Sequence, residues 1–345
     1  MTELYNPEFL FLPQEDVIAA GALDMVATLE DVELAYRLFA SGEIDQPHKS
    51  VMQYDNKKTG QKRHYLTVSM PVYVGGEIHR AGIKWAAESM DNAARGDMPM
   101  GVDIIILHDL EHAIPHAIME GGLITGMRTS AVAGVGAKYL ANPDSRVAGL
   151  IGAGVVGRTM IMALSSAMPS LEEIRLYDIN ETRAHDLADE FKDSITVKVV
   201  DSIETAFKDA DIITTQTTAR KNIVNKEWIP KGSYYAHMST DEAEDGAFLE
   251  TDLLVTDNWQ TLKGWDFFAP TRLVNEGKLN ADEIVDLGEI ILGIKEGRKS
   301  PEDSIIFANL GMGCLDIVIA ERIYNNAKEQ GLGQKLALWE KPLWI

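Results

Sequence analysis

The spacing of apolar and polar residues changes along the chain, and the change predicts two structural regions. Between residues 14 and 40, apolar side chains recur at helical intervals, which predicts two short helices broken near Gly21. From residue 50 to 127, short runs rich in β-formers are separated by turn residues, which predicts an antiparallel meander. Its strands are expected at VMQY (51–54), HYLTVSMPVYV (64–74), AGIKWAA (81–87), DIIIL (103–107), AIPHAIME (113–120) and LITGM (123–127).

The region that follows alternates between buried strands and amphipathic helices. Residues 129–141 are small and helical, and the NPD turn at 142–144 ends them. The alternation beyond this turn is typical of a parallel, doubly wound α/β sheet. The expected strands are RVAGLI (146–151), EIRLYDI (173–179), ITVKVV (195–200), DIITTQT (211–217), SYYAHM (233–238) and LLVTDN (253–258), and the expected helices are 157–168, 181–191 and 203–210.

A glycine-rich turn joins the first of these strands to its helix. The turn comprises Gly152, Ala153, Gly154, Val155, Val156 and Gly157, which fit the pattern GxGxxG. The first glycine permits a tight turn, the second lets a pyrophosphate approach the backbone, and the third lets the helix pack on the strand. Because a strand precedes the turn and a helix follows it, we interpret it as a dinucleotide site with phosphates at the helix N-terminus.

An acidic residue, Asp178, ends the second strand of this region, 21 residues after Gly157. An acid at this distance hydrogen-bonds the ribose 2′-hydroxyl and repels a 2′-phosphate, which predicts NAD rather than NADP. Arg183 lies nearby in the sequence and would weaken the preference for NAD over NADP. A further strand is followed by polar residues that either contact the cofactor ribose or form a polar loop. These residues are Thr215, Gln216 and Thr217.

Composition narrows the classes of function. The 345 residues are enough for two domains, and the net charge of −21 excludes the basic surface that a nucleic-acid partner requires. Cys314 is the single cysteine, so no intrachain disulfide is possible, which fits the cytoplasm. The N-terminus has no basic segment, and the longest apolar stretch, between Arg146 and Arg158, is too short to span a bilayer. We therefore expect a cytoplasmic protein without a signal peptide or membrane partner.

Three histidines are spaced four residues apart: His108, His112 and His116. On a helix this spacing would align them on one face and favour a metal ion. Pro115 and the β-rich runs on either side favour a hairpin instead, and residues four apart on a strand are about 13 Å apart. We therefore expect hairpin histidines and no metal site.

The most specific motif is GLITGMRTSAVAGVGAKYLANPDSRVAGLIGAGVVG (122–157), which pairs an Arg-Thr-Ser step with the glycine turn. Further stretches are QPHKSVM (46–52), AGIKWAAE (81–88), LGEIILGIKEGR (287–298), FANLGMGCLD (307–316) and AKEQGLG (327–333). Together they resemble the ornithine cyclodeaminase/mu-crystallin family over nearly the whole chain. The resemblance implies an α/β fold with two domains: an α+β substrate and dimerisation domain (1–128 and 316–345) and a Rossmann-type NAD domain (129–315). The amphipathic helix at 315–333 is expected to return to the first domain, and the protein is expected to be a homodimer.

The resemblance also implies roles for individual residues. Lys84 and Arg128 would bind the carboxylate of a small amino or imino acid. Lys49 would bind the same carboxylate, at a position where the family commonly has an arginine. Asp241 would be the acid/base that binds the substrate amine, so Asp241 and Lys84 are the catalytic candidates. Physical chemistry supports lysine, arginine and aspartate in these roles, because the substrate needs cations to bind its carboxylate and a protein carboxylate near its nitrogen. A lysine that points into an apolar core is also costly unless it is paired. The implied cofactor contacts are Arg128, Thr129, Val155, Val156, Met238, Ser239, Asn309 and Leu310.

Two positions depart from the family pattern. Cyclodeaminases usually continue after the aspartate with Pro-Gly-Lys, whereas this chain has DEAEDGAF (241–248), with Asp245 near the place of the lysine. Lys49 cannot reproduce the bidentate fork of an arginine. Both changes fall in the substrate shell, and we hypothesise that the added acids suit a substrate with more positive charge.

These features predict an NAD-dependent enzyme that acts at the Cα–N bond of an amino acid. In the cyclodeaminase interpretation the amine is oxidised to an imine, a side-chain amine displaces ammonia, and the hydride returns. The alternatives are an NAD(P)H-dependent amino-acid dehydrogenase and an imine or ketimine (opine-type) reductase. An alternative of another class is a non-catalytic, mu-crystallin-like protein that binds a nucleotide or ligand. The presence of both Lys84 and Asp241 favours an enzyme.

Overall fold

The computed structural model describes residues 7–62, 65–219, 221–240, 242–341 and 343–344. The contacts between its Cα atoms divide the chain into two units. The first comprises Met1–Asp24, Ser41–Arg128 and Met312–Ile345, and the second comprises Met25–Ala40 and Thr129–Gly311. Residues 25–40 were predicted to belong to the first domain. In the structure they form α2 (Met25–Ala40), which contacts α5 (Val155–Ala167) and α11 (Leu287–Ile291) of the second unit.

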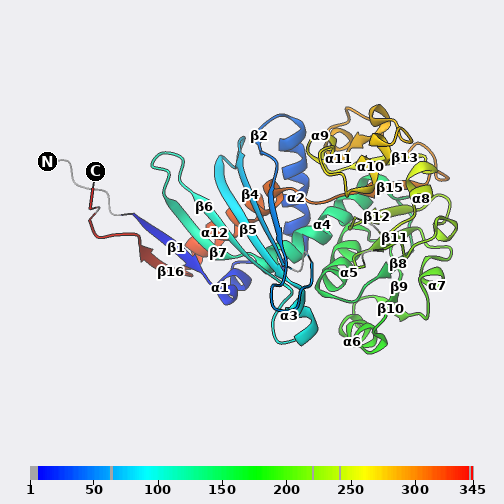
Figure 1. The fold of residues 1–345 in the computed structure, drawn as a ribbon, viewed down its shortest axis with the longest axis horizontal. Helices are drawn as coiled ribbons and strands as arrows, with labels where there is room; N and C mark the ends of the chain where they lie inside the picture. The colour runs from blue at the N-terminus through cyan, green and yellow to red at the C-terminus, as the bar shows by residue number, and fades with distance from the viewer. Residues whose placement is uncertain (1–6, 63–64, 220, 241, 342, 345) are drawn as a thin grey trace. The chain divides into compact units, whose positions relative to one another are not determined.

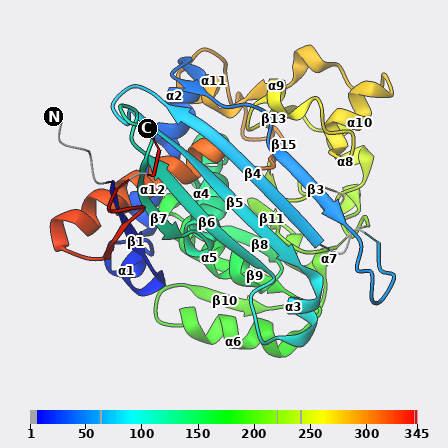
Figure 2. The ribbon, with the colours of Figure 1, turned by 60° about the vertical axis from the view of Figure 1, so that its left-hand side comes forward.

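The first unit is built on one sheet with the strand order β16-β1-β7-β6-β5-β4-β2, and β3 pairs with β4. Strands β3 to β7 form an antiparallel meander, as the alternation predicted, and Figure 2 shows these long strands side by side. The strands are β1 (Glu8–Leu12), β2 (Ile44–Asp45), β3 (Ser50–Tyr54), β4 (Tyr65–Val74), β5 (Arg80–Ser89), β6 (Gly101–His108), β7 (Pro115–Glu120) and β16 (Gln334–Ala337). The helices are α1 (Gln14–Ala19), α3 (Met90–Arg95) and α12 (Gly313–Gln330).

Helix α12 covers one face of this sheet, where it packs on β4, β5 and β6 (Figure 1). The helix ends at Gly331, whose φ of +67° closes the last turn in the left-handed conformation that glycine adopts without strain. Gly82 lets helix and sheet approach, because a Cβ there would lie 2.7 Å from the Ile317 side chain. The helix that the sequence analysis placed at 315–333 is therefore confirmed, with slightly earlier bounds.

One expected strand is wrong. Residues 123–127 (LITGM) open a helix, α4 (Gly122–Leu140), instead of pairing with the meander. The Glu120 carboxylate accepts hydrogen bonds from the N–H groups of Gly122 (2.6 Å) and Leu123 (3.3 Å), which starts the helix directly after β7. Ile124 and Met127 are buried, and a short, fully buried apolar run has the same appearance in a strand as in a helix.

The second unit contains a parallel sheet with the strand order β10-β9-β8-β11-β12-β15-β13-β14. Figure 1 shows the strands from β10 to β13 following one another across the sheet, so the doubly wound α/β fold is confirmed. The strand order reverses between β8 and β11, and ligands of such sheets bind at the carboxyl ends of the strands beside this reversal. The strands are β8 (Val147–Ile151), β9 (Glu173–Tyr177), β10 (Thr196–Val199), β11 (Ile212–Thr215), β12 (Tyr234–His237), β13 (Leu253–Thr256), β14 (Val285–Asp286) and β15 (Ile305–Ala308).

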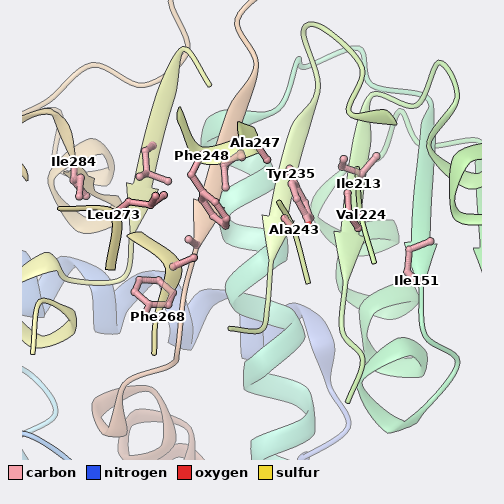
Figure 3. Packing of buried hydrophobic residues seen from close by; sticks show 14 of the residues in the cluster. Ile151, Ile213, Val224, Tyr235, Ala243, Ala247, Phe248, Phe268, Leu273 and Ile284 are labelled. Carbon is pink, nitrogen blue, oxygen red and sulfur yellow. The ribbon is translucent and has the colours of Figure 1, made fainter. Parts of the chain in front are cut away.

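Helices and a large apolar cluster complete the second unit. Figure 3 shows Tyr235, Phe248 and Phe268 in this cluster, together with Ile151 and Ile213 from the sheet. The helices are α2 (Met25–Ala40), the C-terminal part of α4, α5 (Val155–Ala167), α6 (Glu181–Phe191), α7 (Ile203–Phe207), η1 (Lys226–Trp228), α8 (Asp245–Leu249), α9 (Trp259–Leu262), α10 (Ala269–Asn275), η2 (Ala281–Glu283) and α11 (Leu287–Ile291). Within the described ranges, none of the helices is long and apolar enough to cross a membrane.

Candidate active site

The glycine turn lies between β8 and α5. Gly152 has a φ of +111°, and a Cβ there would lie 2.8 Å from the Gln216 carbonyl oxygen. A Cβ at Gly157 would lie 2.1 Å from the Gly152 carbonyl oxygen, so only glycine lets the helix pack this closely. A Cβ at Gly154 would meet no described atom within 4 Å, and no side chain caps α5. The turn therefore leaves room for a phosphate at a helix N-terminus, where backbone N–H groups attract anions.

Asp178 follows β9 and is held beside this turn. Its Oδ2 accepts a hydrogen bond from the Ala153 N–H (2.7 Å), and its Oδ1 accepts one from the Asn180 N–H (2.8 Å). The carboxylate thus lies where β8 and β9 end, the position at which a dinucleotide site places the acid that binds a ribose. Together with the open space at Gly154, this arrangement fits NAD.

The polar residues at the end of β11 and just after it have two different surroundings. Thr215 is fully buried, and its hydroxyl hydrogen-bonds the Tyr235 hydroxyl (2.8 Å), so its side chain supports the core. Gln216 Nε2 donates to the Gly152 carbonyl oxygen (3.3 Å), which ties the β11 loop to the glycine turn. The Thr217 N–H donates to Glu242 Oε1 (2.7 Å). Of these residues, Gln216 and Thr217 lie half-buried at the sheet edge where a cofactor would bind.

The loop after β12 holds the proposed acid/base position. Asp241 itself lies outside the described residues. Met238 Sδ accepts a hydrogen bond from Asn309 Nδ2 (3.0 Å), so two of the predicted cofactor contacts lie against each other at neighbouring strand ends. The Leu310 N–H donates to Asp257 Oδ2 (2.9 Å). The Ser239 hydroxyl is buried and has no hydrogen-bond partner among the described residues.

The acids that follow Asp241 are engaged within their own unit. Glu242 is completely buried against Thr217, and Glu244 accepts a hydrogen bond from the first N–H of η1 (3.2 Å). Asp245 forms a fork with Arg272 at 2.5 and 3.1 Å, and this guanidinium holds the pKa of Asp245 below its usual value. Glu244 and Asp245 are thus paired with protein groups, whereas Glu242 Oε2 is buried with no hydrogen-bond partner among the described residues. The hypothesis that the added acids suit a substrate with more positive charge stays a prediction.

Lys84 lies in the first unit, on the face of β5 that α12 covers. Neighbouring strands place Met70 and Ile105 directly beside it, both buried, and Lys84 is only 2% exposed. Burial among apolar neighbours lowers the pKa of its ammonium group, because the charged form loses water. The inward orientation that the sequence analysis required for a functional lysine is thus observed.

Two carboxylates that the sequence analysis missed surround this lysine. Lys84 Nζ lies 3.4 Å from Asp316 Oδ1 on α12 and 3.5 Å from Asp103 Oδ2 on β6. Asp316 is fully buried, and Asp103 accepts a hydrogen bond from the Thr125 hydroxyl of α4. Their signal in the sequence is an aspartate within an apolar run, DIIIL for Asp103 and CLDIVI for Asp316, since a charge at such a position needs a partner.

Arg128 joins the same cluster from α4, three residues after Thr125. Its Nε donates to Asp316 Oδ1 (3.3 Å), the oxygen that Lys84 also contacts. The two terminal nitrogens of Arg128 have no hydrogen-bond partner among the described residues, so they remain for a ligand. Lys49 directly precedes β3 and is partly exposed. The ion pairs of the cluster described here are formed by Lys84, Arg128, Asp103 and Asp316.

The three histidines lie on the predicted hairpin. His108 ends β6, His112 lies in the turn, and His116 lies on β7. The His116 ring nitrogen Nδ1 is 2.7 Å from the Arg80 guanidinium, which also forks with Glu321 of α12. Across the described part of the chain, no group of three or more His, Cys, Asp or Glu side chains is placed to hold a metal ion.

Comparison with known proteins places this fold and these residues in one family. The profile of the ornithine cyclodeaminase/mu-crystallin family matches residues 10–331. The chain belongs to this family, as the motifs around the glycine turn predicted.

Three relatives match over nearly their whole length. N-((2S)-2-amino-2-carboxyethyl)-L-glutamate dehydrogenase of Staphylococcus aureus is 27% identical over 97% of this chain and 100% of its own. The solved Δ1-pyrroline-2-carboxylate reductase of Thermococcus litoralis, in complex with NADH and L-proline, is 29% identical over 95% and 100% of the two chains, with a TM-score of 0.85. A solved archaeal alanine dehydrogenase dimer with bound NAD is 27% identical over 96% and 100%, with a TM-score of 0.84.

Proposed function

We propose that this protein is an NAD-dependent oxidoreductase that acts at the Cα–N bond of a small amino or imino acid. The observation that carries the proposal is the buried cluster in which Lys84 and Arg128 share one oxygen of Asp316. Two neighbouring cations, with N–H groups of Arg128 still available to donate, suit the two oxygens of a substrate carboxylate. The glycine turn and Asp178 supply the features that a dinucleotide needs, and both solved relatives described above contain NAD or NADH.

In this mechanism Lys84 and Arg128 bind and orient the substrate carboxylate. Because both side chains are buried, water is excluded and each charged hydrogen bond is strengthened. Binding of one carboxylate by two cations fixes the direction of the substrate Cα–H. Asp241 takes the proton from the substrate nitrogen during oxidation and returns it during reduction, the role that family membership implies for this position. NAD, when bound, accepts the hydride from Cα or supplies it as NADH.

A dehydrogenase or reductase is favoured over a cyclodeaminase. Cyclodeaminases usually have a lysine shortly after the aspartate, whereas Asp245 near that place is paired with Arg272. The relatives named above are dehydrogenases and a reductase. In the proposed direction the substrate amine becomes an imine as NAD becomes NADH, and water then releases ammonia and a 2-oxo acid.

We expect steady accumulation of NADH when the protein is incubated with NAD and its amino acid. The measurement is absorbance at 340 nm across a panel of amino acids, with ammonia assayed in parallel and NADP as a matched cofactor control. NADH and ammonia in equal amounts support the dehydrogenase, and NADH consumption with a cyclic imine or with a 2-oxo acid and an amine supports the reductase. Release of ammonia without net NADH would identify a cyclodeaminase. No turnover with any of these substrates would contradict the proposed function.

We also propose that the protein is a homodimer that pairs through the sheet face opposite α12. The register aligns an apolar row across β5, β6, β7 and β1 on this face, and Trp85 and Ile104 beside it are 38% and 37% exposed. A contiguous apolar patch of this kind marks an interaction surface. The row consists of Ile83, Ile106, Ile118 and Phe11.

Ile106→Glu is expected to convert this dimer to single chains, because it buries a charge at the centre of the row. The measurement is mass by light scattering after size exclusion. Ile294→Glu, at an exposed position of the second unit, is the matched control and should leave the mass at two chains. A wild-type protein that elutes with the mass of one chain would contradict the proposed interface.

A further inference from the structure

Asp316 occupies the centre of the carboxylate-binding cluster without facing solvent. It lies in the first turn of α12 and is fully buried, and its Oδ1 is the common acceptor for Lys84 Nζ (3.4 Å) and Arg128 Nε (3.3 Å). Two cations this close repel each other, and a shared anion removes that repulsion. The N-terminal turn of a helix also favours a negative charge.

The charged groups that face Lys84 come from three elements. They are Asp103 on β6, Arg128 on α4 and Asp316 on α12. With Lys84 itself, the cluster contains two cations and two anions and is neutral before substrate binds. Asp103, on β6, accepts a hydrogen bond from Thr125 of α4 and contacts Lys84, whereas Asp316 contacts both cations.

The presence of a buried aspartate at position 316 is not explained by a contribution to the stability of the fold. Its Oδ2 is buried with no hydrogen-bond partner among the described residues, which is costly for a carboxylate. Buried ion pairs of this kind contribute little net stability compared with apolar residues of similar size. An imperfectly satisfied charge in a packed helix therefore points to function.

We propose that Asp316 is a positioning residue that holds Lys84 and Arg128 together so that both cations bind one substrate carboxylate. The inference rests on the proposed function, because it explains how the clamp for that carboxylate is assembled. Asp316 acts through the two cations and does not itself contact the substrate.

The oxygen that Asp316 shares between the two cations also affects the ionisation of Lys84. Burial lowers the pKa of its ammonium group, and the negative charge of Asp316 is the strongest influence that opposes this effect. Without that charge, Arg128 would lower the pKa of Lys84 further. The protonated clamp would then be lost at a lower pH than in the wild type.

The test compares Asp316→Asn with Glu321→Gln. Glu321 is a matched control because it lies on the same helix, is also largely buried, and pairs with Arg80 outside the cluster. We expect Asp316→Asn to raise KM for the amino acid about 10- to 100-fold, as expected for charged hydrogen bonds, with a smaller change in kcat. We also expect the alkaline limb of the kcat/KM profile to move to lower pH. Glu321→Gln should change neither quantity, and the Kd for NAD should stay within about twofold in both variants.

Folding is checked by thermal unfolding, and Asp316→Glu is the second variant if Asp316→Asn does not fold. The glutamate keeps the charge but moves the oxygen by one methylene, so KM should rise while the alkaline limb stays at its wild-type pH. Wild-type KM in either variant, or an equal shift of the limb in Asp316→Glu, would overturn the inference. A wild-type protein that turns over no amino or imino acid would instead overturn the proposed function, so the two failures are distinguishable.

Discussion

Replacing Lys84 by methionine is expected to lower kcat/KM for the amino acid by about two to three orders of magnitude. Methionine matches the length of the lysine stem but provides neither charge nor donor. The substrate carboxylate then loses one of its two cations in a site from which water is excluded, and truncating one member of a buried, hydrogen-bonded charge pair costs about 2–5 kcal/mol. Steady-state kinetics with the best substrate from the NADH assay measures the effect.

The same substitution is expected to destabilise the first unit. It leaves Asp103 and Asp316 in a buried cluster with Arg128 as the remaining cation, and an uncompensated buried charge costs about 3–5 kcal/mol. Activity is therefore compared at a temperature where thermal unfolding shows the variant to be folded, with the Kd for NAD measured alongside. Lys138→Met, which removes a half-exposed lysine paired with Glu33, is the control and should change activity little. A folded Lys84→Met protein with wild-type kcat/KM would disprove the carboxylate clamp.

Acidification is expected to destabilise the second unit through His237. This residue ends β12 and is fully buried, with ring centroids 5.6 Å from Tyr235 and 5.2 Å from Phe248. Neither ring nitrogen has a hydrogen-bond partner among the described residues, and burial lowers the pKa of His237 from 6.5 to about 4. The folded protein therefore resists protonation of this ring, whereas the unfolded chain accepts the proton near pH 6.5.

The direction of this pH effect on stability follows from the number of protons that each state binds. Between pH 6.5 and about 4 the unfolded chain binds more protons at this site, so the stability present above pH 6.5 is lost as the pH falls. The pKa difference corresponds to about 3 kcal/mol. His237→Phe, which keeps an aromatic ring between Tyr235 and Phe248, should lose this part of the pH dependence, and exposed His185→Phe should retain it. The measurement is denaturant unfolding at several pH values, and an identical pH slope for His237→Phe and the wild type would refute the prediction.

Six of the eight strands of the second unit could be predicted, because each is a short apolar run bounded by turn residues. The two-residue strand β14 and the strand β15, which lies between β12 and β13, were missed. The glycine turn was specified even more sharply, since steric limits at Gly152 and Gly157 leave no alternative residue. The prediction of a strand at residues 123–127 was wrong because a buried helix segment and a buried strand have the same apolar pattern. The capping contact from Glu120 that decides for a helix depends on where β7 ends, which the local pattern does not contain.

Some residues of the candidate site could likewise be predicted from the sequence and others could not. Lys84 was found because a lysine in an apolar strand is costly and so demands an explanation. Asp316 carries the same kind of signal, yet its partner Lys84 is 232 residues away in the sequence. The pairing arises only when α12 packs on β5, so the spacing along the chain could not reveal it. The pairing of Asp245 was missed for a similar reason, because Arg272 lies on a separate helix, 27 residues further along the chain.

Strand β5 has a consequence for how this protein can diversify. Lys84 and Trp85 are neighbours in the chain, but they face opposite sides of the sheet, one toward the clamp and one toward the proposed partner chain. Inserting or deleting a single residue before Lys84 would exchange the two sides and direct the ammonium group outward. Variation within β5 is therefore expected to be by substitution, whereas changes of length are expected to be tolerated at the exposed residues 57–62 between β3 and β4.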